Sequence, residues 1–116
     1  MAINFSVKVE KKDLPVVRVE GEIDIYTCPD LQTVFGDLIT GGHDSFILDL
    51  ENIQYIDSTG LGTIAAAANE LMVKNGSIKI ICNKPQIKKI FEVSGLQEKN
   101  ITLFEDEVSA LSNQES

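Results

Sequence analysis

Short apolar runs of strand length alternate with helix-like stripes over most of this 116-residue chain. Three such runs, FILDL (46–50), IKIIC (78–82) and ITLF (101–104), are separated by segments whose apolar residues recur with the period of a helix. Strands that alternate with helices pair in parallel, because each helix returns the chain to the same end of the sheet. The sequence therefore predicts an α/β fold with a mainly parallel sheet and functional groups beyond the carboxyl ends of its strands.

The N-terminal part of the chain adds two further strands to this pattern. Ile3, Phe5, Val7 and Val9 alternate with polar residues, which is typical of a half-buried strand. After a break at KKDLP, the segment VVRVEGEID (16–24) alternates again. We expect the two segments to pair as an antiparallel hairpin, so the predicted order is β-β-α-β-α-β-α-β-α.

Residues typical of helix ends bound the helical stripes. The first helix is expected to begin at a capping box of Thr27 and Asp30. Proline is typical of the first turn of a helix, and glycine or asparagine of its end. Pro29 and Pro85 accordingly mark helix starts, and helix ends are expected at Gly41-Gly42, Asn75-Gly76 and Gly95. A last, short amphipathic helix carries Val108 and Leu111, and residues 113–116 are predicted to form a disordered tail.

The composition is that of one globular domain, with 43% apolar and 24% charged residues. A net charge of −8 disfavours a nucleic-acid or anionic-membrane partner and fits a basic protein surface better. Acidity often serves solubility alone, however, and this is the favoured interpretation of the overall charge. No apolar run approaches the ~20 residues that cross a bilayer, and the N-terminus lacks the features of a signal peptide. Cys28 and Cys82 are too few for a disulfide framework or a metal cluster, so we expect reduced thiols, no metal and no cofactor in a cytoplasmic protein.

The segment YIDSTGLGTIAAAANEL (55–71) joins an apolar strand to a helix and has an unusual composition. Gly60 and Gly62 each cost roughly 1 kcal/mol relative to alanine inside a helix, so a requirement other than helix stability is expected here. Known catalytic motifs do not fit: the only histidine, His43, lies in a connecting loop, and the serine lacks a G-x-S-x-G elbow. The spacing also differs by one residue from an aspartic-protease half-site, and a P-loop would need a lysine after the glycines. The protein is therefore predicted not to be an enzyme.

A phosphoryl-accepting aspartate is a second interpretation of the same corner. Asp57 follows a strand in an acidic chain of this length, and Lys84-Pro85 is also similar to response-regulator receiver domains. A receiver needs an adjacent acidic pair after its first strand to hold magnesium. Here Glu20, Glu22 and Asp24 stand at alternating positions instead, so the receiver is the weaker hypothesis.

The remaining hypothesis is that Ser58 presents its hydroxyl to a partner protein. Serine before a helix is common as an N-cap, which explains Ser58 but not Thr59 and the two glycines. A phosphoryl group on Ser58 would add ~1.5–2 negative charges at a helix N-terminus that tolerates them. It would repel a partner packed on residues 60–62, more so beside Asp24 and Asp57. Either hydroxyl, of Ser58 or of Thr59, satisfies this chemistry.

Three segments resemble the bacterial anti-sigma-factor antagonists, which are STAS-domain proteins: GEIDIYTCP (21–29), LDLENIQYIDSTGLG (48–62) and IKKIFEVSGL (87–96). The resemblance covers nearly the whole chain and implies one STAS domain over residues 1–112. In that family the unphosphorylated protein binds an anti-sigma factor and thereby frees a sigma factor. The anti-sigma factor is also an ATP-dependent kinase that phosphorylates the serine of the motif, and a serine phosphatase removes the phosphate.

The resemblance also assigns roles to residues of this chain. It makes Ser58 the phosphoacceptor and Asp24 an acid beside it, although a solvated strand-end carboxylate explains Asp24 about equally well. The partner contacts that it implies are Asp24, Tyr26, Thr27, Asp57, Ser58, Thr59, Gly60, Leu61 and Gly62. STAS domains also serve in stressosomes and in anion transporters. A chain expected to hold a single domain favours the free-standing regulator, with a stressosome-type scaffold as the alternative.

Overall fold

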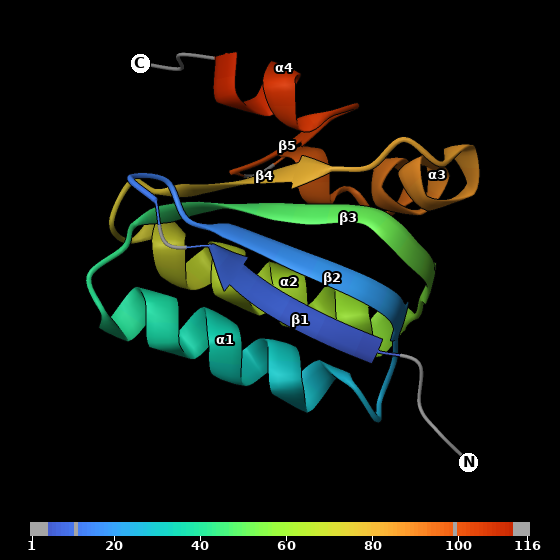
Figure 1. Cartoon of the computed structure of the whole chain (residues 1–116), viewed down its shortest axis with the longest axis horizontal. Helices are drawn as coiled ribbons and strands as arrows, with labels where there is room; N and C mark the ends of the chain where they lie inside the picture. Colours follow the sequence, from blue (N-terminus) through green and yellow to red (C-terminus); the bar gives the residue numbers. More distant parts are fainter. Residues whose placement is uncertain (1–4, 11, 99, 113–116) are drawn as a thin grey trace.

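The computed structural model describes residues 5–10, 12–98 and 100–112. Its elements follow the predicted order, with one short 3-10 helix added before the last strand (Figure 1). In chain order they are β1 (Phe5–Glu10), β2 (Val16–Ile23), α1 (Cys28–Thr40), β3 (Ser45–Ile56), α2 (Ser58–Met72), β4 (Ser77–Ile81), α3 (Pro85–Ser94), η1 (Leu96–Glu98), β5 (Ile101–Phe104) and α4 (Glu107–Ser112). Ile3 and the predicted tail 113–116 lie outside the described residues.

Five strands form one sheet in the order β1-β2-β3-β4-β5. β1 pairs antiparallel with β2, where Val7 lies opposite Val19, and the other three pairs are parallel. The predicted hairpin and the mainly parallel sheet are therefore confirmed. The third strand is longer than the predicted run 46–50, because its pairing with β2 continues as far as Ile23 and Ile56.

The helices are divided unequally between the two faces of the sheet. α1, α2 and α3 each connect neighbouring parallel strands, and the strands follow one another in a single direction across the sheet. Right-handed crossovers then place all three helices on the same face. Figure 1 shows α1 and α2 below the sheet and α4 on the opposite side, where α4 contacts β4 and β5.

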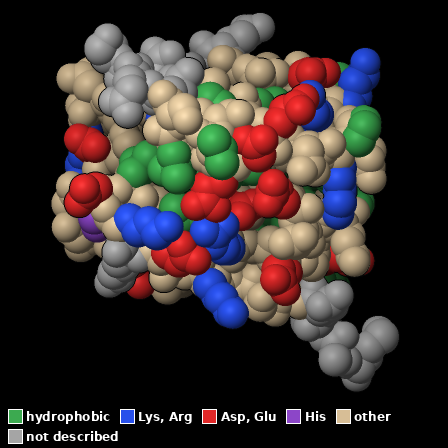
Figure 2. Space-filling view, turned by 45° about the horizontal axis from the view of Figure 1, so that its top comes forward, with side chains coloured by type: hydrophobic (Ala, Val, Ile, Leu, Met, Phe, Trp, Pro, Cys, Tyr) green, Lys and Arg blue, Asp and Glu red, His purple; other side chains and the backbone are tan. Residues whose placement is uncertain are grey.

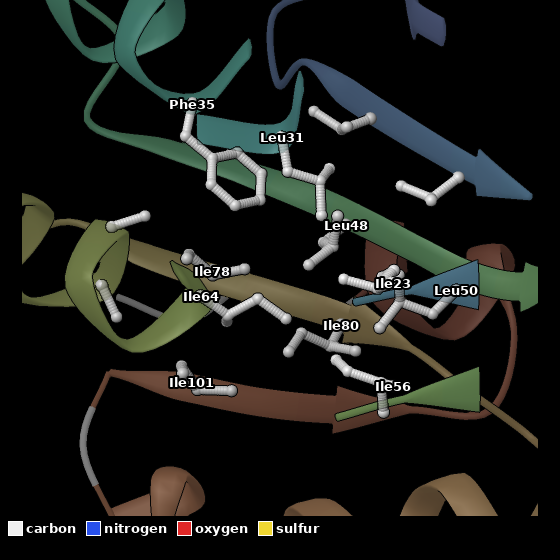
Figure 3. Packing of buried hydrophobic residues seen from close by; sticks show 14 of the residues in the cluster. Ile23, Leu31, Phe35, Leu48, Leu50, Ile56, Ile64, Ile78, Ile80 and Ile101 are labelled. Atoms are coloured by element: carbon white, nitrogen blue, oxygen red, sulfur yellow. The ribbon is translucent and has the colours of Figure 1, made fainter. Parts of the chain in front are cut away.

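The main core lies between the sheet and the crossover helices (Figure 3). Leu31 and Phe35 of α1, Ile64 of α2 and Phe91 of α3 are buried against the inward-facing side chains of the strands. The ring of Phe35 stacks on that of Phe46, with centroids 5.2 Å apart. Full burial of each such side chain contributes about 1.5–3 kcal/mol, so this face supplies most of the hydrophobic stabilisation.

A smaller core lies on the other face, under α4. Its buried members are Val16, Ile47, Ile81 and Ala110. The amphipathic face predicted for this helix is wrong, because Val108 is 73% exposed and Leu111 is 43% exposed. The orientation of α4 follows instead from Glu107, whose carboxylate pairs with Arg18 on the sheet, and from Ala110, which is small enough to pack closely there.

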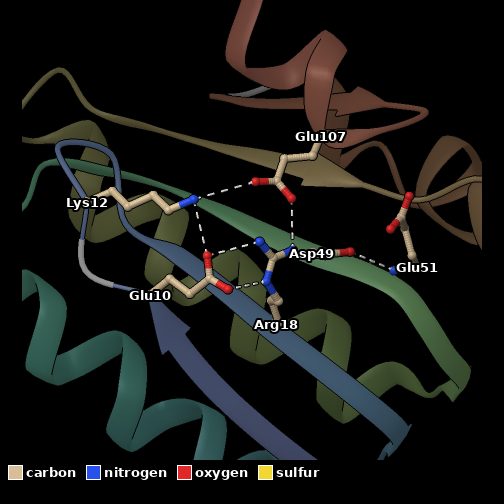
Figure 4. A network of polar contacts seen from close by, with 6 residues as sticks. All are labelled: Glu10, Lys12, Arg18, Asp49, Glu51 and Glu107. Carbon is tan, nitrogen blue, oxygen red and sulfur yellow. Dashed lines mark hydrogen bonds and ion pairs between the residues drawn. The ribbon is translucent and has the colours of Figure 1, made fainter.

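Arg18 joins three elements to β2 through ion pairs (Figure 4). Its guanidinium donates to the Glu10 carboxylate at 2.8 and 3.0 Å and to Asp49 at 2.7 Å, and it lies 2.9 Å from Glu107. Asp49 is only 5% exposed, so its charge requires the neighbouring cation.

Figure 2, which brings the α4 side forward, shows acidic and basic side chains intermingled on this face. Hydrogen bonds from Arg18 and Lys12 lower the pKa of Glu10 to about 2.

This pKa predicts a contribution of Glu10 to stability that depends on pH. The ordinary pKa is 4.5 and the value in the folded protein is about 2. The contribution is therefore fully present above pH 4.5 and is lost as the pH falls towards 2. We expect Glu10→Gln to reduce the slope of unfolding free energy against pH across this window, measured by urea denaturation.

Glu92→Gln is the matched control, because Glu92 is exposed on α3 and forms no ion pair with any described residue. Its slope should equal that of the unchanged protein. The pKa of Glu51 shifts in the opposite direction, since burial and the neighbouring Asp49 raise it. The pH dependence of the unchanged protein therefore contains both effects, and only its difference from that of Glu10→Gln reports on Glu10. An unchanged slope in Glu10→Gln would contradict the prediction.

Candidate functional site

The candidate site is the edge of the sheet at which β2 and β3 end side by side. Ile23 pairs with Ile56 in the parallel ladder, and the next residues, Asp24 and Asp57, leave the sheet together. The backbone N–H of Asp57 donates to the Ile23 carbonyl at 3.1 Å, which keeps the two strand ends in contact. The parallel order thus brings two residues that are far apart in the sequence to one edge.

Asp57, rather than Ser58, is the N-cap of α2. Its backbone is extended, and its Oδ1 accepts from the Gly60 N–H at 3.0 Å and from the Thr59 hydroxyl at 2.5 Å. These two hydrogen bonds, the one from Thr59 first, lower the pKa of Asp57. Ser58 therefore lies next to the N-cap and does not itself cap the helix, because the Asp57 carboxylate reaches two donors of the first turn at once.

Ser58 is exposed at the first position of α2. Among the described residues none hydrogen-bonds to the Ser58 hydroxyl, whereas the Thr59 hydroxyl is bound to Asp57. The free N–H groups of the first turn and the positive end of the helix dipole lie beside it. A negative group carried by Ser58 would therefore meet favourable backbone charge and would need no space inside the fold.

The two glycines of the corner differ in what surrounds them. A Cβ at Gly60 would lie 2.6 Å from Ile23 Cγ2 and 2.8 Å from Ile56 Cγ1, whereas a Cβ at Gly62 would meet nothing within 4 Å. The expectation that both glycines admit a partner is corrected for Gly60, which is buried and lets α2 pack directly on the two strand ends. Gly62 is open to solvent.

Asp24 and Thr27 hold the loop between β2 and α1. The Asp24 Oδ1 accepts from the Tyr26 N–H at 2.9 Å and from the Thr27 N–H at 3.2 Å. The Thr27 hydroxyl donates to the Glu22 carbonyl at 2.8 Å and accepts from the Asp24 N–H at 2.9 Å. The predicted capping box is wrong, because this hydroxyl closes the loop and makes no cap bond to the helix. Thr27 is also buried, so its side chain is not on the surface of the site.

Three large side chains border the corner in solvent. Ile25 is 61% exposed, Tyr26 is 78% exposed and Tyr55 is 50% exposed. Tyr26 is among the predicted contacts, whereas Ile25 and Tyr55 are not. Ile25 could have been predicted as a surface contact, because it is an apolar residue in a loop between predicted elements. Tyr55 could not, because its place beside the corner follows from the extension of β3 past residue 50. Aromatic and aliphatic groups exposed around a polar centre are typical of protein interaction surfaces.

The described residues form neither a metal site nor a receiver-like pair of Asp57 with Lys84 at this corner. Within the described ranges, no group of three or more His, Cys, Asp or Glu residues could hold a metal ion. Lys84 donates its ammonium to the Ile53 carbonyl at 2.7 Å rather than to Asp57, and Asp57 is engaged as a helix cap. Burial raises the pKa of the Cys82 thiol to about 11. None of the helices in the described part of the chain has the length and apolar character of a membrane span.

Comparison with known proteins identifies the class to which this fold and corner belong. A model of the STAS domain matches residues 6–110. An anti-sigma-B factor antagonist of Staphylococcus aureus is 34% identical over 82 residues, which cover 71% of this chain and 76% of that protein. The chain therefore belongs to the STAS-domain family, as the sequence resemblance predicted.

Solved structures show the same architecture. The crystal structure of an anti-sigma factor antagonist from Mycobacterium paratuberculosis has a TM-score of 0.85 and 26% identity, and the match covers 97% of this chain and 95% of that one. The Bacillus cell fate determinant SpoIIAA in its phosphorylated form has a TM-score of 0.70 at 22% identity, covering 93% and 96%. The unphosphorylated form of SpoIIAA has a TM-score of 0.72 at 19% identity, covering 93% and 94%. The predicted fold class is confirmed.

The different surroundings of the two glycines predict that the same substitution destabilises the fold at Gly60 and not at Gly62. Gly60→Ala should lower the unfolding free energy by roughly 1–3 kcal/mol, because its methyl group would overlap Ile23 and Ile56 in a closed core. Gly62→Ala should leave stability unchanged or raise it by up to about 1 kcal/mol, the ordinary gain of helix propensity. Urea denaturation of the two variants measures both effects. Equal effects of the two substitutions would mean that Gly60 does not sit on the strand ends.

Proposed function

We propose that this protein is an anti-sigma-factor antagonist that regulates transcription by partner switching. In this proposal residues 1–112 act as one STAS unit whose unphosphorylated form binds an anti-sigma factor and releases a sigma factor. The names of the Staphylococcus and Mycobacterium relatives support this role. The observation that carries it is the exposed Ser58 hydroxyl at the start of α2, bordered by the exposed side chains of Ile25, Tyr26 and Tyr55.

Phosphorylation of Ser58 is the proposed signal that ends binding. The existence of SpoIIAA structures in phosphorylated and unphosphorylated forms supports a phosphorylation switch in proteins of this fold. A phosphoryl group adds ~1.5–2 negative charges. In a closed interface that charge would be desolvated beside the carboxylates of Asp24 and Asp57, which costs free energy unless the partner supplies a cation. In the free protein the same charge stays in water at a helix N-terminus.

The proposed partners follow from this cycle. The anti-sigma factor is the ATP-dependent serine kinase, a serine phosphatase restores the hydroxyl, and neither nucleic acid nor a membrane is involved. We propose that the partner contacts the residues of the corner that reach its surface, namely Asp24, Tyr26, Asp57, Ser58, Thr59, Leu61 and Gly62, with Ile25 and Tyr55 added to this surface. Asp24, Asp57 and Leu61 are half-buried, and the others are exposed. Thr27 and Gly60 support the surface from within, since both are buried.

Incubation of the purified chain with ATP and the anti-sigma factor of its host is the direct test. We expect one phosphate on Ser58, none on Ser58→Ala, and binding by Ser58→Asp that is weaker by roughly 10- to 100-fold, because a charge would enter the interface. Titration calorimetry measures the binding and mass spectrometry measures the site. Equal affinities of Ser58→Asp and Ser58→Ala would exclude the switch.

The melting temperature separates a surface switch from an unfolding switch. The phosphorylated chain should melt close to the unmodified chain, because the new charge lies at a helix start that favours anions. A large fall in melting temperature would contradict the proposed mechanism. A mass in solution well above that of one chain would favour the scaffold alternative.

Thr59 provides a test of why Ser58 is the acceptor. Its hydroxyl donates to the Asp57 carboxylate, which fixes its orientation, whereas the Ser58 hydroxyl has no such partner among the described residues and is free to turn towards a phosphoryl donor. We expect Thr59→Val to keep phosphorylation of Ser58 and to lose about 0.5–1 kcal/mol of stability with the hydrogen bond. Thr59→Ser is the control, since it retains the hydroxyl. Transfer of the phosphate to Thr59 in Ser58→Ala would show that the Asp57 contact does not restrict the choice.

A further inference from the structure

A groove of about 620 Å³ lies between α1 and α2. Its lining extends from Cys28 to Ile39 on α1 and from Thr59 to Glu70 on α2. Both helices follow parallel strands, so they begin at the same sheet edge and the groove runs along them. At 1.5 Å per residue this length is about 16 Å, or three helical turns.

Small residues keep the groove open. Gly36 of α1 and Gly62 of α2 both line it, and a Cβ built on either one meets nothing within 4 Å. Ala66 lines it from α2 and is exposed, whereas Phe35 and Ala67 are buried beneath. The groove is therefore an apolar channel that can admit side chains from another molecule.

Glu70 is the one charged residue that lines this groove in the described part of the chain. α1 and α2 themselves carry Asp30, Asp37 and Glu70 and no basic residue, and neither has a basic residue in its last turn. The first basic residue after α2 is Lys74, whose ammonium donates to the Ile39 carbonyl at 3.1 Å. This contact already places a cation at the carboxyl end of α1, so the negative side chain that remains at this end of the groove is Glu70.

We propose that this groove binds an amphipathic, basic helix of about three turns that belongs to the partner of the Ser58 surface. Apolar side chains spaced along one face of that helix would enter the groove at Gly36, Gly62 and Ala66. A Lys or Arg residue on its flank would face Glu70. The proposal extends the proposed function, because it names a second recognition element for the same partner.

The groove is continuous with the Ser58 surface. Ile25, Thr59 and Gly62 belong to both, at the end where α1 and α2 begin. The opposite end, at Ile39 and Glu70, is a helix length away from the phosphoacceptor. A phosphate on Ser58 therefore disrupts one end of a longer interface, whereas the partner helix bound in the groove determines which partner is recognised.

A synthetic helix tests the groove without the natural partner. The probe is a peptide of about 12 residues with leucines at helical spacing and lysines on the other face, held helical by a lactam bridge because helices of this length are marginal in water. We expect it to shift the NMR amide signals of Gly36, Gly62 and Ala66 in the full chain. A peptide with glutamate in place of lysine should bind about ten-fold more weakly.

Substitutions that fill the groove decide whether the peptide binds there. Ala66→Leu and Gly36→Leu should each weaken binding about ten-fold, while their melting temperatures stay unchanged or rise, because both positions have free space in a helix. Asn69→Leu is the matched control: it lies exposed on α2 outside the groove and should bind like the unchanged chain. Absence of binding, shifts confined to another face, or unchanged affinity in Ala66→Leu would overturn the proposal.

Titration with the anti-sigma factor separates this proposal from the proposed function. Glu70→Lys should weaken that binding about ten-fold, whereas Glu92→Lys on α3, which makes the same charge change, should not. If Ser58→Asp abolishes binding but Glu70→Lys and Ala66→Leu do not weaken it, the groove proposal fails and the switch stands. If the groove variants weaken binding and Ser58→Asp does not, the switch fails and the groove stands. A rise in mass with concentration that Ala66→Leu abolishes would assign the groove to a second copy of the chain and overturn the proposal.

Discussion

The direct contact of Gly60 with the ends of β2 and β3 determines the geometry of this corner. Ile23 and Ile56 are paired in the ladder, and only a residue without a Cβ lets the first turn of α2 rest on both. This approach brings the Asp57 carboxylate within reach of the Gly60 N–H and turns Ser58 outwards. A glycine that costs helix stability in isolation is thus required by the tertiary packing.

Periodicity and strand order made most of the fold predictable. Alternation of apolar runs with helical stripes indicates a parallel sheet, and in such a sheet Asp24 and Asp57, which both follow strands, lie at one edge. The errors concern choices that depend on atoms distant in sequence. Thr27 is a good cap residue locally, yet the Glu22 carbonyl takes its hydroxyl. Gly60 and Gly62 are indistinguishable in sequence, and only the neighbouring strand ends separate their roles.

The two faces of the sheet manage charge in different ways. On the α4 face Arg18 is shared among Glu10, Asp49 and Glu107, so acidic groups there are neutralised within the molecule. The ion pairs also explain the orientation of α4, which the apolar pattern of its own six residues could not fix. On the α1 and α2 face the acids have no basic residue within their helices. Charge that is left unneutralised is available to a partner, and it raises the rate and specificity of association with basic surfaces.

Helix capping by Asp57 separates the stability of the fold from the chemistry of Ser58. If the serine hydroxyl capped α2, a phosphoryl group on it would remove a cap worth about 1 kcal/mol, and modification would be coupled to the folding of the helix. Because the Asp57 carboxylate performs the capping, the Ser58 hydroxyl contributes no bond to any described residue. Modification can then alter the charge and shape of the surface while the backbone beneath it stays fixed. The tightly packed Gly60 reinforces this separation, since the first turn cannot shift without moving Ile23 and Ile56 in the core.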